Sequence, residues 1–142
     1  MKVKDRMTRD AVAVAAEESA AVAARLMARC NVGSLPVCGE DGRLVGMVTD
    51  RDLVLRCMAM DEDPATFPVS QVMTARVAAV SPEDELAEAA VLMAREQVRR
   101  LPVTENGRLA GIVTLSDLGR GGDYAMEAAQ CLGEISKNIK KR

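Results

Sequence analysis

The sequence predicts a mixed α/β fold in which one unit of strands and helices is written twice. The stretch that begins at Met7 aligns with the stretch that begins at Met73, and about half of the positions through Leu53 are identical in the two copies. In each copy, short apolar runs typical of strands alternate with Ala-rich stretches whose apolar residues have helical spacing. The dipeptide Asn106-Gly107, between two such runs, is a strong hairpin signal. Each copy therefore predicts the order strand, helix, strand, strand, helix, and two copies can cover each other's open face.

The first copy gives its elements in that order. The run AVAV at residues 11–14 predicts a short strand, and an Ala-rich stretch predicts a helix over roughly 19–30. The runs SLPV at 34–37 and RLVGMVT at 43–49 predict the next two strands, with a turn between them. A second helix is expected to start at Asp50.

The second copy repeats this order. The run VAAV at 77–80 predicts a strand, after which Ser81 is expected to cap a helix with Pro82 at its first position. The runs RLPV at 100–103 and RLAGIVT at 108–114 predict the two strands of the hairpin. The buried face of the helix is expected to consist of residues three and four positions apart, namely Leu86, Ala89, Ala90 and Met93.

These elements divide the chain into four expected parts. The first copy takes residues 1–60, a linker takes 61–69, and the second copy takes 70–120. The remaining residues, 121–142, are expected to hold a C-terminal helix from about Asp123 to Ile135, followed by a basic, solvated tail.

Composition narrows the classes of function. The 142 residues carry 19 basic and 21 acidic side chains, with one Phe and one Tyr, which argues against a nucleic-acid-binding surface. The chain has no His, so the usual general base and the Ser-His and Cys-His nucleophiles are missing, and we expect a protein that is not an enzyme. Four scattered Cys residues predict neither a metal site nor a disulfide framework. Without a membrane-length apolar run or a signal core, a cytoplasmic location is expected.

One motif recurs at equivalent places, as GMVTDRD at 46–52 and GIVTLSD at 111–117. Thr and Asp at this spacing, where a strand meets a helix, can be a capping pair in which the Thr accepts an amide hydrogen bond. The same geometry suits a nucleotide, because helix N-termini attract phosphate and a carboxylate can accept both hydroxyls of a ribose. The Gly would let a ligand or a neighbouring backbone approach closely. The two interpretations are compatible, and one Thr can serve in both.

Together with the upstream SLPV and RRLPV runs, these motifs resemble a pair of CBS motifs, which form a Bateman module. The resemblance covers about residues 3–120. It implies two β-α-β-β-α motifs packed with pseudo-twofold symmetry, with a cleft that binds an adenosine nucleotide (AMP, ADP or ATP) and no obligatory cofactor. It also implies a homodimer formed through the Ala-rich helices. The chain then resembles a stand-alone sensor, in which nucleotide occupancy shifts the conformation and an unknown regulated protein partner responds to it.

The resemblance also implies which residues bind the nucleotide. The Asp of each motif would hold the ribose, the Thr would lie near the sugar and phosphate, and the apolar residue after the Gly would line the base. Arg51, and Arg100 from the second copy, would bring positive charge to the phosphates at the Asp52 site. Serines stand at the matching places, so the Asp117 site is expected to be weaker. The full set is Met47, Thr49, Arg51, Asp52, Arg100, Ile112, Thr114 and Asp117.

The main alternative is a ligand-free homodimerisation scaffold. In that hypothesis both Thr-x-x-Asp motifs act only as helix caps. A third hypothesis, an enzyme with a Cys nucleophile, is weakened by the missing His. Stabilisation by an adenylate would distinguish the sensor from the scaffold.

Overall fold

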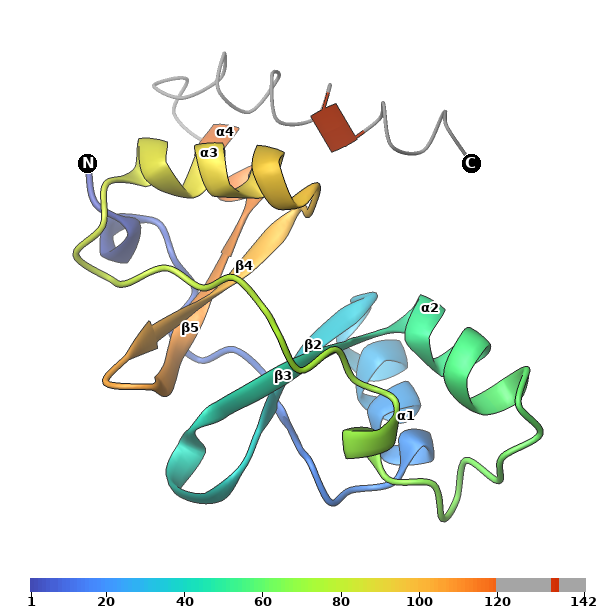
Figure 1. The fold of residues 1–142 in the computed structure, drawn as a ribbon. Coiled ribbons are helices and arrows are strands. Elements are labelled where there is room, and N and C mark those ends of the chain that lie inside the picture. Colours follow the sequence, from blue (N-terminus) through green and yellow to red (C-terminus); the bar gives the residue numbers. More distant parts are fainter. Residues whose placement is uncertain (120–133, 136–142) are drawn as a thin grey trace. The chain divides into compact units, whose positions relative to one another are not determined.

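The structure is a computed structural model, and it describes residues 1–119 and 134–135. The chain forms two compact units (Figure 1). Unit 1 comprises Met1–Ala11 and Ala78–Arg142, and unit 2 comprises Val12–Val77. The mixed α/β class predicted from the sequence is confirmed. The expected helix over residues 123–135 lies almost entirely outside the described residues.

The sheet of unit 2 contains the three strands of the first copy. Strand β1 (Val14–Ala15) pairs in parallel with β2 (Ser34–Cys38), and β2 pairs in antiparallel fashion with β3 (Leu44–Thr49). A single 3-10 turn, η2 (Glu40–Gly42), joins β2 to β3. All three strands predicted for the first copy are present, although the first is Val14–Ala15 and shares only Val14 with the predicted run at 11–14.

Two helices complete the core of unit 2. Helix α1 (Ala20–Cys30) begins where predicted, because the Ser19 Oγ accepts a hydrogen bond from the Val22 backbone N–H at 3.3 Å. Helix α2 (Asp50–Leu53) continues into the π-helical turn η3 (Val54–Met58). The core of the unit consists of Val14, Ala20, Ala23, Met27, Leu35, Val37, Val48, Cys57, Val69 and Val72.

Unit 1 is built around the hairpin of β4 (Arg100–Glu105) and β5 (Arg108–Thr114). The turn residues Asn106 and Gly107 have φ angles of 55° and 80°, as the predicted hairpin turn requires. The run at 77–80, predicted as the first strand of this copy, does not form a strand, and only an isolated parallel bridge joins Val80 to Val103. Helix α4 (Leu115–Gly119) follows β5.

Helix α3 (Leu86–Glu96) has the predicted buried face but a later start. Ser81 was expected to cap this helix, and that expectation is wrong. Ser81 to Asp84 instead form a separate turn, in which the Ser81 N–H donates to the Asp84 carboxylate at 2.9 Å. Glu85 then has an extended backbone at the N-cap position, which corresponds to Ser19 in the first copy. Alignment of the two copies locates this helix better than the local Ser-Pro signal does.

Each unit is completed by a segment from the other copy, which we call its crossing segment. Residues 1–11 belong to unit 1 and contain the 3-10 turn η1 (Val3–Asp5), and residues 69–77 belong to unit 2 and contain η4 (Val69–Gln71). The Val3 N–H donates to the Asp84 carbonyl at 2.9 Å, and the Val69 N–H donates to the Glu18 carbonyl at 2.8 Å. The expected boundaries at 60, 69 and 120 therefore mark the two copies along the sequence. They do not mark the folded units, because residues 1–11 fold with the second copy and residues 69–77 fold with the first.

Candidate functional site

Both Thr-x-x-Asp motifs form reciprocal capping boxes. The Thr49 Oγ1 accepts from the Asp52 N–H at 3.0 Å, while the Asp52 Oδ2 accepts from the Thr49 N–H at 3.0 Å. The corresponding distances for Thr114 and Asp117 are 3.2 Å and 2.8 Å. The capping interpretation of the motif is therefore confirmed in both copies. Each box fixes its carboxylate at the start of a helix, where the backbone N–H groups favour negative charge.

The two Asp side chains differ in what surrounds them. The Asp52 side chain is 14% exposed, and its Oδ1, which the capping box does not use, lies 4.0 Å from the Arg56 Nε. Taken over whole residues, Asp117 is buried and Asp52 is half-buried, and the Arg6 Nη1 donates to the Asp117 backbone carbonyl at 3.5 Å. Asp52 is thus the less buried of the two, and its Oδ1 takes no part in the capping box.

The glycines of the motif are explained by the crossing segments. A Cβ on Gly46 would lie 2.6 Å from the Thr74 carbonyl oxygen, and a Cβ on Gly111 would overlap the Thr8 carbonyl oxygen. Of the two reasons the sequence allowed for these glycines, close approach of a neighbouring backbone accounts for both.

The apolar residues predicted to line the base come directly after these glycines. Met47 exchanges two backbone hydrogen bonds with Thr74, at 3.0 Å and 2.8 Å, and Ile112 exchanges two with Thr8, at 2.9 Å and 2.8 Å. Both side chains are buried, at 9% and 7% exposure, yet neither belongs to the core cluster of its own unit. Because side chains alternate along a strand, they lie on the sheet face opposite to the core.

The basic residues predicted to bind phosphate belong to different units. Arg51 is exposed on the first turn of α2 in unit 2. Arg100 is half-buried in unit 1, where it is the strand partner of Thr114. The structure therefore brings Arg100 next to the Thr of its own copy. Its expected contact with phosphate at the Asp52 site stays a prediction.

Sequence reasoning missed Arg56, which links the capping box to the crossing segment of unit 2. The Arg56 Nη1 donates to the carbonyl oxygens of Val72 and Met73, at 3.0 Å and 2.9 Å. Its four-residue spacing from Asp52 on one helix was the available signal, since such pairs are neighbours on a helical surface. No feature of the local sequence predicts that Arg56 donates to the carbonyl oxygens of Val72 and Met73.

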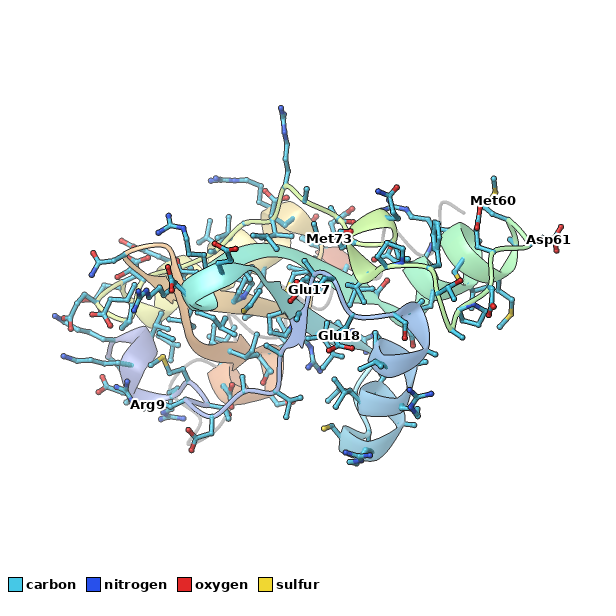
Figure 2. All side chains as sticks on the ribbon, turned by 90° about the horizontal axis from the view of Figure 1, so that it is seen from below. Arg9, Glu17, Glu18, Met60, Asp61 and Met73 are labelled. Carbon is cyan, nitrogen blue, oxygen red and sulfur yellow. The ribbon has the colours of Figure 1, made fainter. Side chains whose placement is uncertain are left out.

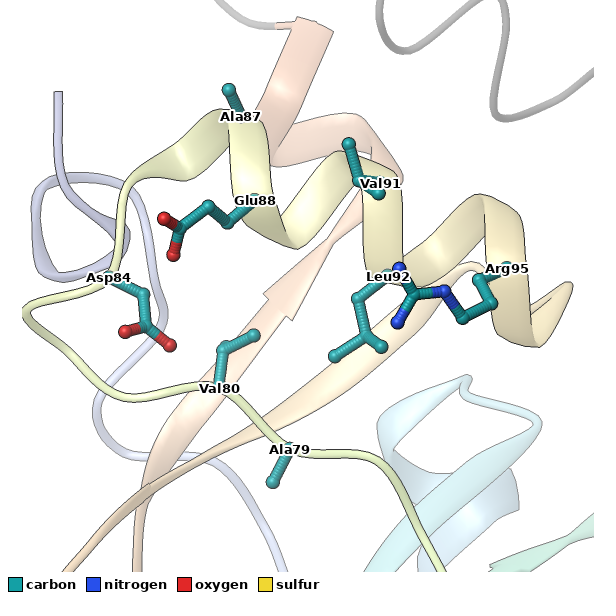
Figure 3. A pocket seen from close by; sticks show the side chains of 8 residues that line it. All are labelled: Ala79, Val80, Asp84, Ala87, Glu88, Val91, Leu92 and Arg95. Atoms are coloured by element: carbon teal, nitrogen blue, oxygen red, sulfur yellow. The ribbon is translucent and has the colours of Figure 1, made fainter.

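Three hollows within single units are lined by residues other than those predicted to bind nucleotide. One runs along α3 beside Ala79 and Val80, with a volume of about 420 Å³ (Figure 3). The second lies at the turn of the β4–β5 hairpin, at about 640 Å³, and the third lies beside the first turn of α1, at about 600 Å³. The one along α3 is an open groove with carboxylates toward one end and the Arg95 guanidinium toward the other (Figure 3).

Neither metal ligands nor reactive thiols gather in the described part of the chain. Residues 1–119 and 134–135 contain no group of three or more Cys, Asp or Glu side chains that could hold a metal ion. Burial raises the pKa of the Cys57 thiol, with Glu62 and Asp63 adding to the effect, and burial also raises the pKa of Cys38. Within the same residues, no helix has the length and apolar character needed to cross a bilayer.

Comparison with known proteins gives a consistent result. The family model for the CBS domain matches residues 3–59 and 69–120. The CBS domain-containing protein YhcV of Bacillus subtilis is 45% identical over 134 residues, which cover 94% of this chain and 94% of YhcV. Hypoxic response protein 1 of Mycobacterium tuberculosis is 37% identical over 117 residues, which cover 82% of each chain.

Solved structures agree with the sequence relatives. The crystal structure of Hypoxic Response Protein I, which contains two coordinated zinc ions, superposes with a TM-score of 0.80 at 36% identity and covers 85% of this chain and 98% of that one. A hexameric CBS-CP12 protein from bloom-forming cyanobacteria has a TM-score of 0.73 at 28% identity and covers 89% of this chain and 73% of its own. Both are similar to this chain along most of its length.

Proposed function

Because this chain belongs to the CBS domain family and carries two such domains, we propose that it is a sensor that binds an adenosine nucleotide. Pairs of CBS domains are generally regulatory, ligand-binding modules without catalytic activity. The observation that carries the proposal is the Asp52 capping box, which uses Oδ2 and leaves Oδ1 outside the box at a helix start. A carboxylate fixed in this way is preorganised to accept hydrogen bonds from a ribose diol.

The other residues take roles that follow from their positions. Met47 and Ile112 would contact the base, since both lie on the sheet face away from the core of their units. Thr49 and Thr114 would lie beside the sugar, and Arg51 and Arg100 would neutralise phosphate charge. We propose that Asp117 forms the weaker site, because it is less exposed than Asp52.

Nucleotide occupancy would act by population shift. A ligand moves such an equilibrium only by its differential affinity for the two conformations. We propose that the protein is a cytoplasmic homodimer, with contacts through the Ala-rich helices α1 and α3, and that an as yet unidentified partner protein recognises the occupied state. The hexameric CBS-CP12 protein supports assembly as a property of related chains.

The test is thermal unfolding with AMP, ADP and ATP added separately, backed by calorimetry. At a ligand concentration a hundred times the Kd, binding stabilises the folded protein by about 2.7 kcal/mol, which raises Tm by several degrees. Asp52→Asn is the informative variant, because the amide oxygen can keep the cap while the NH₂ group replaces the second acceptor. We expect Asp52→Asn to abolish the Tm rise, while the matched Asp117→Asn retains most of it.

The scaffold hypothesis is the second candidate, and one observation favours it. Both capping boxes and both glycines are fully explained by contacts within the protein. If no adenylate changes Tm while light scattering shows a homodimer, the scaffold replaces the sensor.

A further inference from the structure

Unit 2 has an apolar pocket beside the first turn of α1, and none of its lining residues is among those predicted to bind nucleotide. Its volume is about 600 Å³, within the range of sites that bind small molecules or single side chains. Helix α1 contributes Ala20, Ala21 and Ala24 to the lining. Helix α2 and η3 contribute Leu53, Cys57 and Met58, and the linker contributes Asp61 to Pro64. We call this the linker pocket.

Hydrogen bonds fix the linker wall to both helices. The Ala21 N–H donates to the Pro64 carbonyl at 2.9 Å, which attaches the wall to the start of α1. The Glu62 N–H donates to the Cys57 carbonyl at 3.0 Å, and the Cys57 Sγ donates to the Glu62 carbonyl at 3.6 Å. The pocket is therefore a built feature of the unit, because its wall cannot move without breaking these bonds.

The rim of the linker pocket is acidic, while its walls are apolar. Asp61, Glu62 and Asp63 are all exposed, and Arg25 is the one cation among the lining residues. Figure 2 shows Asp61 pointing outward beside Met60 at the end of the helix that α2 and η3 form. The carbonyl end of that helix adds negative potential at the same place. Met58, on the pocket wall, is 71% exposed.

We propose that the linker pocket docks a short cationic segment of a partner protein. One apolar side chain of the segment enters between α1 and η3, and neighbouring Lys or Arg side chains meet the acidic rim. Charge complementarity selects this occupant. A nucleotide would bring phosphates to three carboxylates, and a second copy docked by twofold symmetry would bring one acidic rim toward another. The proposal does not depend on nucleotide binding at Asp52.

The experiment uses the full chain labelled with ¹³C-methyl methionine and the probe peptide acetyl-Lys-Leu-Lys-Lys-amide. The Met58 methyl signal, assigned with Met58→Leu, reports on the pocket, and Met93, which is fully buried in unit 1, is the reference. We expect the peptide to shift the Met58 signal saturably without moving the Met93 signal. Peptides with Ser in place of Leu, or with Glu in place of every Lys, should leave the Met58 signal unchanged.

Two variants test the rim. Asp61→Asn with Glu62→Gln removes two charges, and Asn keeps the left-handed backbone at position 61, where φ is 58°. Asp63 is left intact because its Oδ1 accepts from the Ala65 N–H at 3.0 Å. We expect this double variant to weaken peptide binding about threefold to tenfold. The matched control removes two exposed charges elsewhere, with Glu40→Gln and Glu96→Gln, and should bind like the parent.

Three results would overturn the proposal. The first is an unmoved Met58 signal with the Lys peptide. The second is binding of the Glu peptide as tightly as the Lys peptide, because charge complementarity could then not be what selects the occupant. The third is a Met58 signal that follows protein concentration and ignores the peptide, which would assign the pocket to a second copy. Asp52→Asn should leave the peptide response intact, so failure of the nucleotide proposal would not affect this one.

Discussion

Replacing Gly111 by Ala adds a methyl group where the crossing segment of unit 1 passes over β5. The added carbon would overlap the Thr8 carbonyl oxygen and lie 3.4 Å from the Arg9 Cα. These are backbone atoms, so no side-chain rotation relieves the overlap. The segment must either stay strained, at about 1–3 kcal/mol, or leave β5 and lose its two hydrogen bonds to Ile112, at about 1 kcal/mol each. Whichever response costs less sets the outcome, so we expect a loss of about 1–3 kcal/mol of unfolding free energy.

Urea and thermal unfolding of Gly111→Ala measure this loss, with Gly119→Ala as the control. Gly119 is the last residue of α4, and a Cβ there would meet no atom within 4 Å. We expect the control to be neutral or slightly stabilised, because Ala is favoured over Gly in helices. We expect Gly111→Ala to lower Tm by roughly 5–10 °C and to increase amide exchange at Thr8 and Ile112. If the two variants were equally stable, the close contact of the crossing segment with Gly111 would be refuted.

Two further predictions concern single charged residues. Hydrogen bonds from Lys2 and Lys4 lower the pKa of Glu83 from 4.5 to about 2. Because the folded pKa is the lower one, this contact stabilises the protein above about pH 4.5 and is lost as the pH falls toward 2, so acid titration should show that Glu83→Gln is less stable than the parent only at the higher pH. Arg56→Met should destabilise the protein by about 1–3 kcal/mol in urea unfolding, since two carbonyl oxygens of the crossing segment lose their charged donor. An unchanged urea midpoint would mean that these bonds contribute nothing.

The elements were largely predictable because their signals are local. Ser19 is followed by a helical pattern and caps α1, and Asn106-Gly107 forms the turn between two strands. The start of α3 was predicted too early because Ser81 and Asp84 satisfy each other in a separate turn. A capping side chain followed by Pro can serve a turn as well as a helix, and only the alignment with Ser19 separates the two.

The exchange of the crossing segments could not be predicted, although the residues that make the contact, Met-Thr and Gly, are repeated in the sequence. Met-Thr and Gly recur in both copies, and the structure makes them partners, with Thr8 over Gly111 and Thr74 over Gly46. Such pairing depends on topology, and two copies of one sequence leave it open whether Met-Thr packs on its own copy or on the other. The same limit hid Arg56, whose backbone partners lie on the crossing segment.

Arg56 connects the proposed ribose site with the segment that leads into the second copy. Its Nε lies 4.0 Å from the Asp52 Oδ1, and its Nη1 donates to the Val72 and Met73 carbonyl oxygens. A ribose that takes Oδ1 competes for the carboxylate and leaves the guanidinium to the carbonyl oxygens alone. Nucleotide at Asp52 would then change how tightly residues 69–77 are held, and the chain continues from them to Val80, which forms an isolated bridge to Val103 in unit 1. We propose that the population shift of the sensor would act through these contacts, and Arg56→Lys, which lacks the guanidinium fork, should preserve nucleotide binding while weakening that coupling.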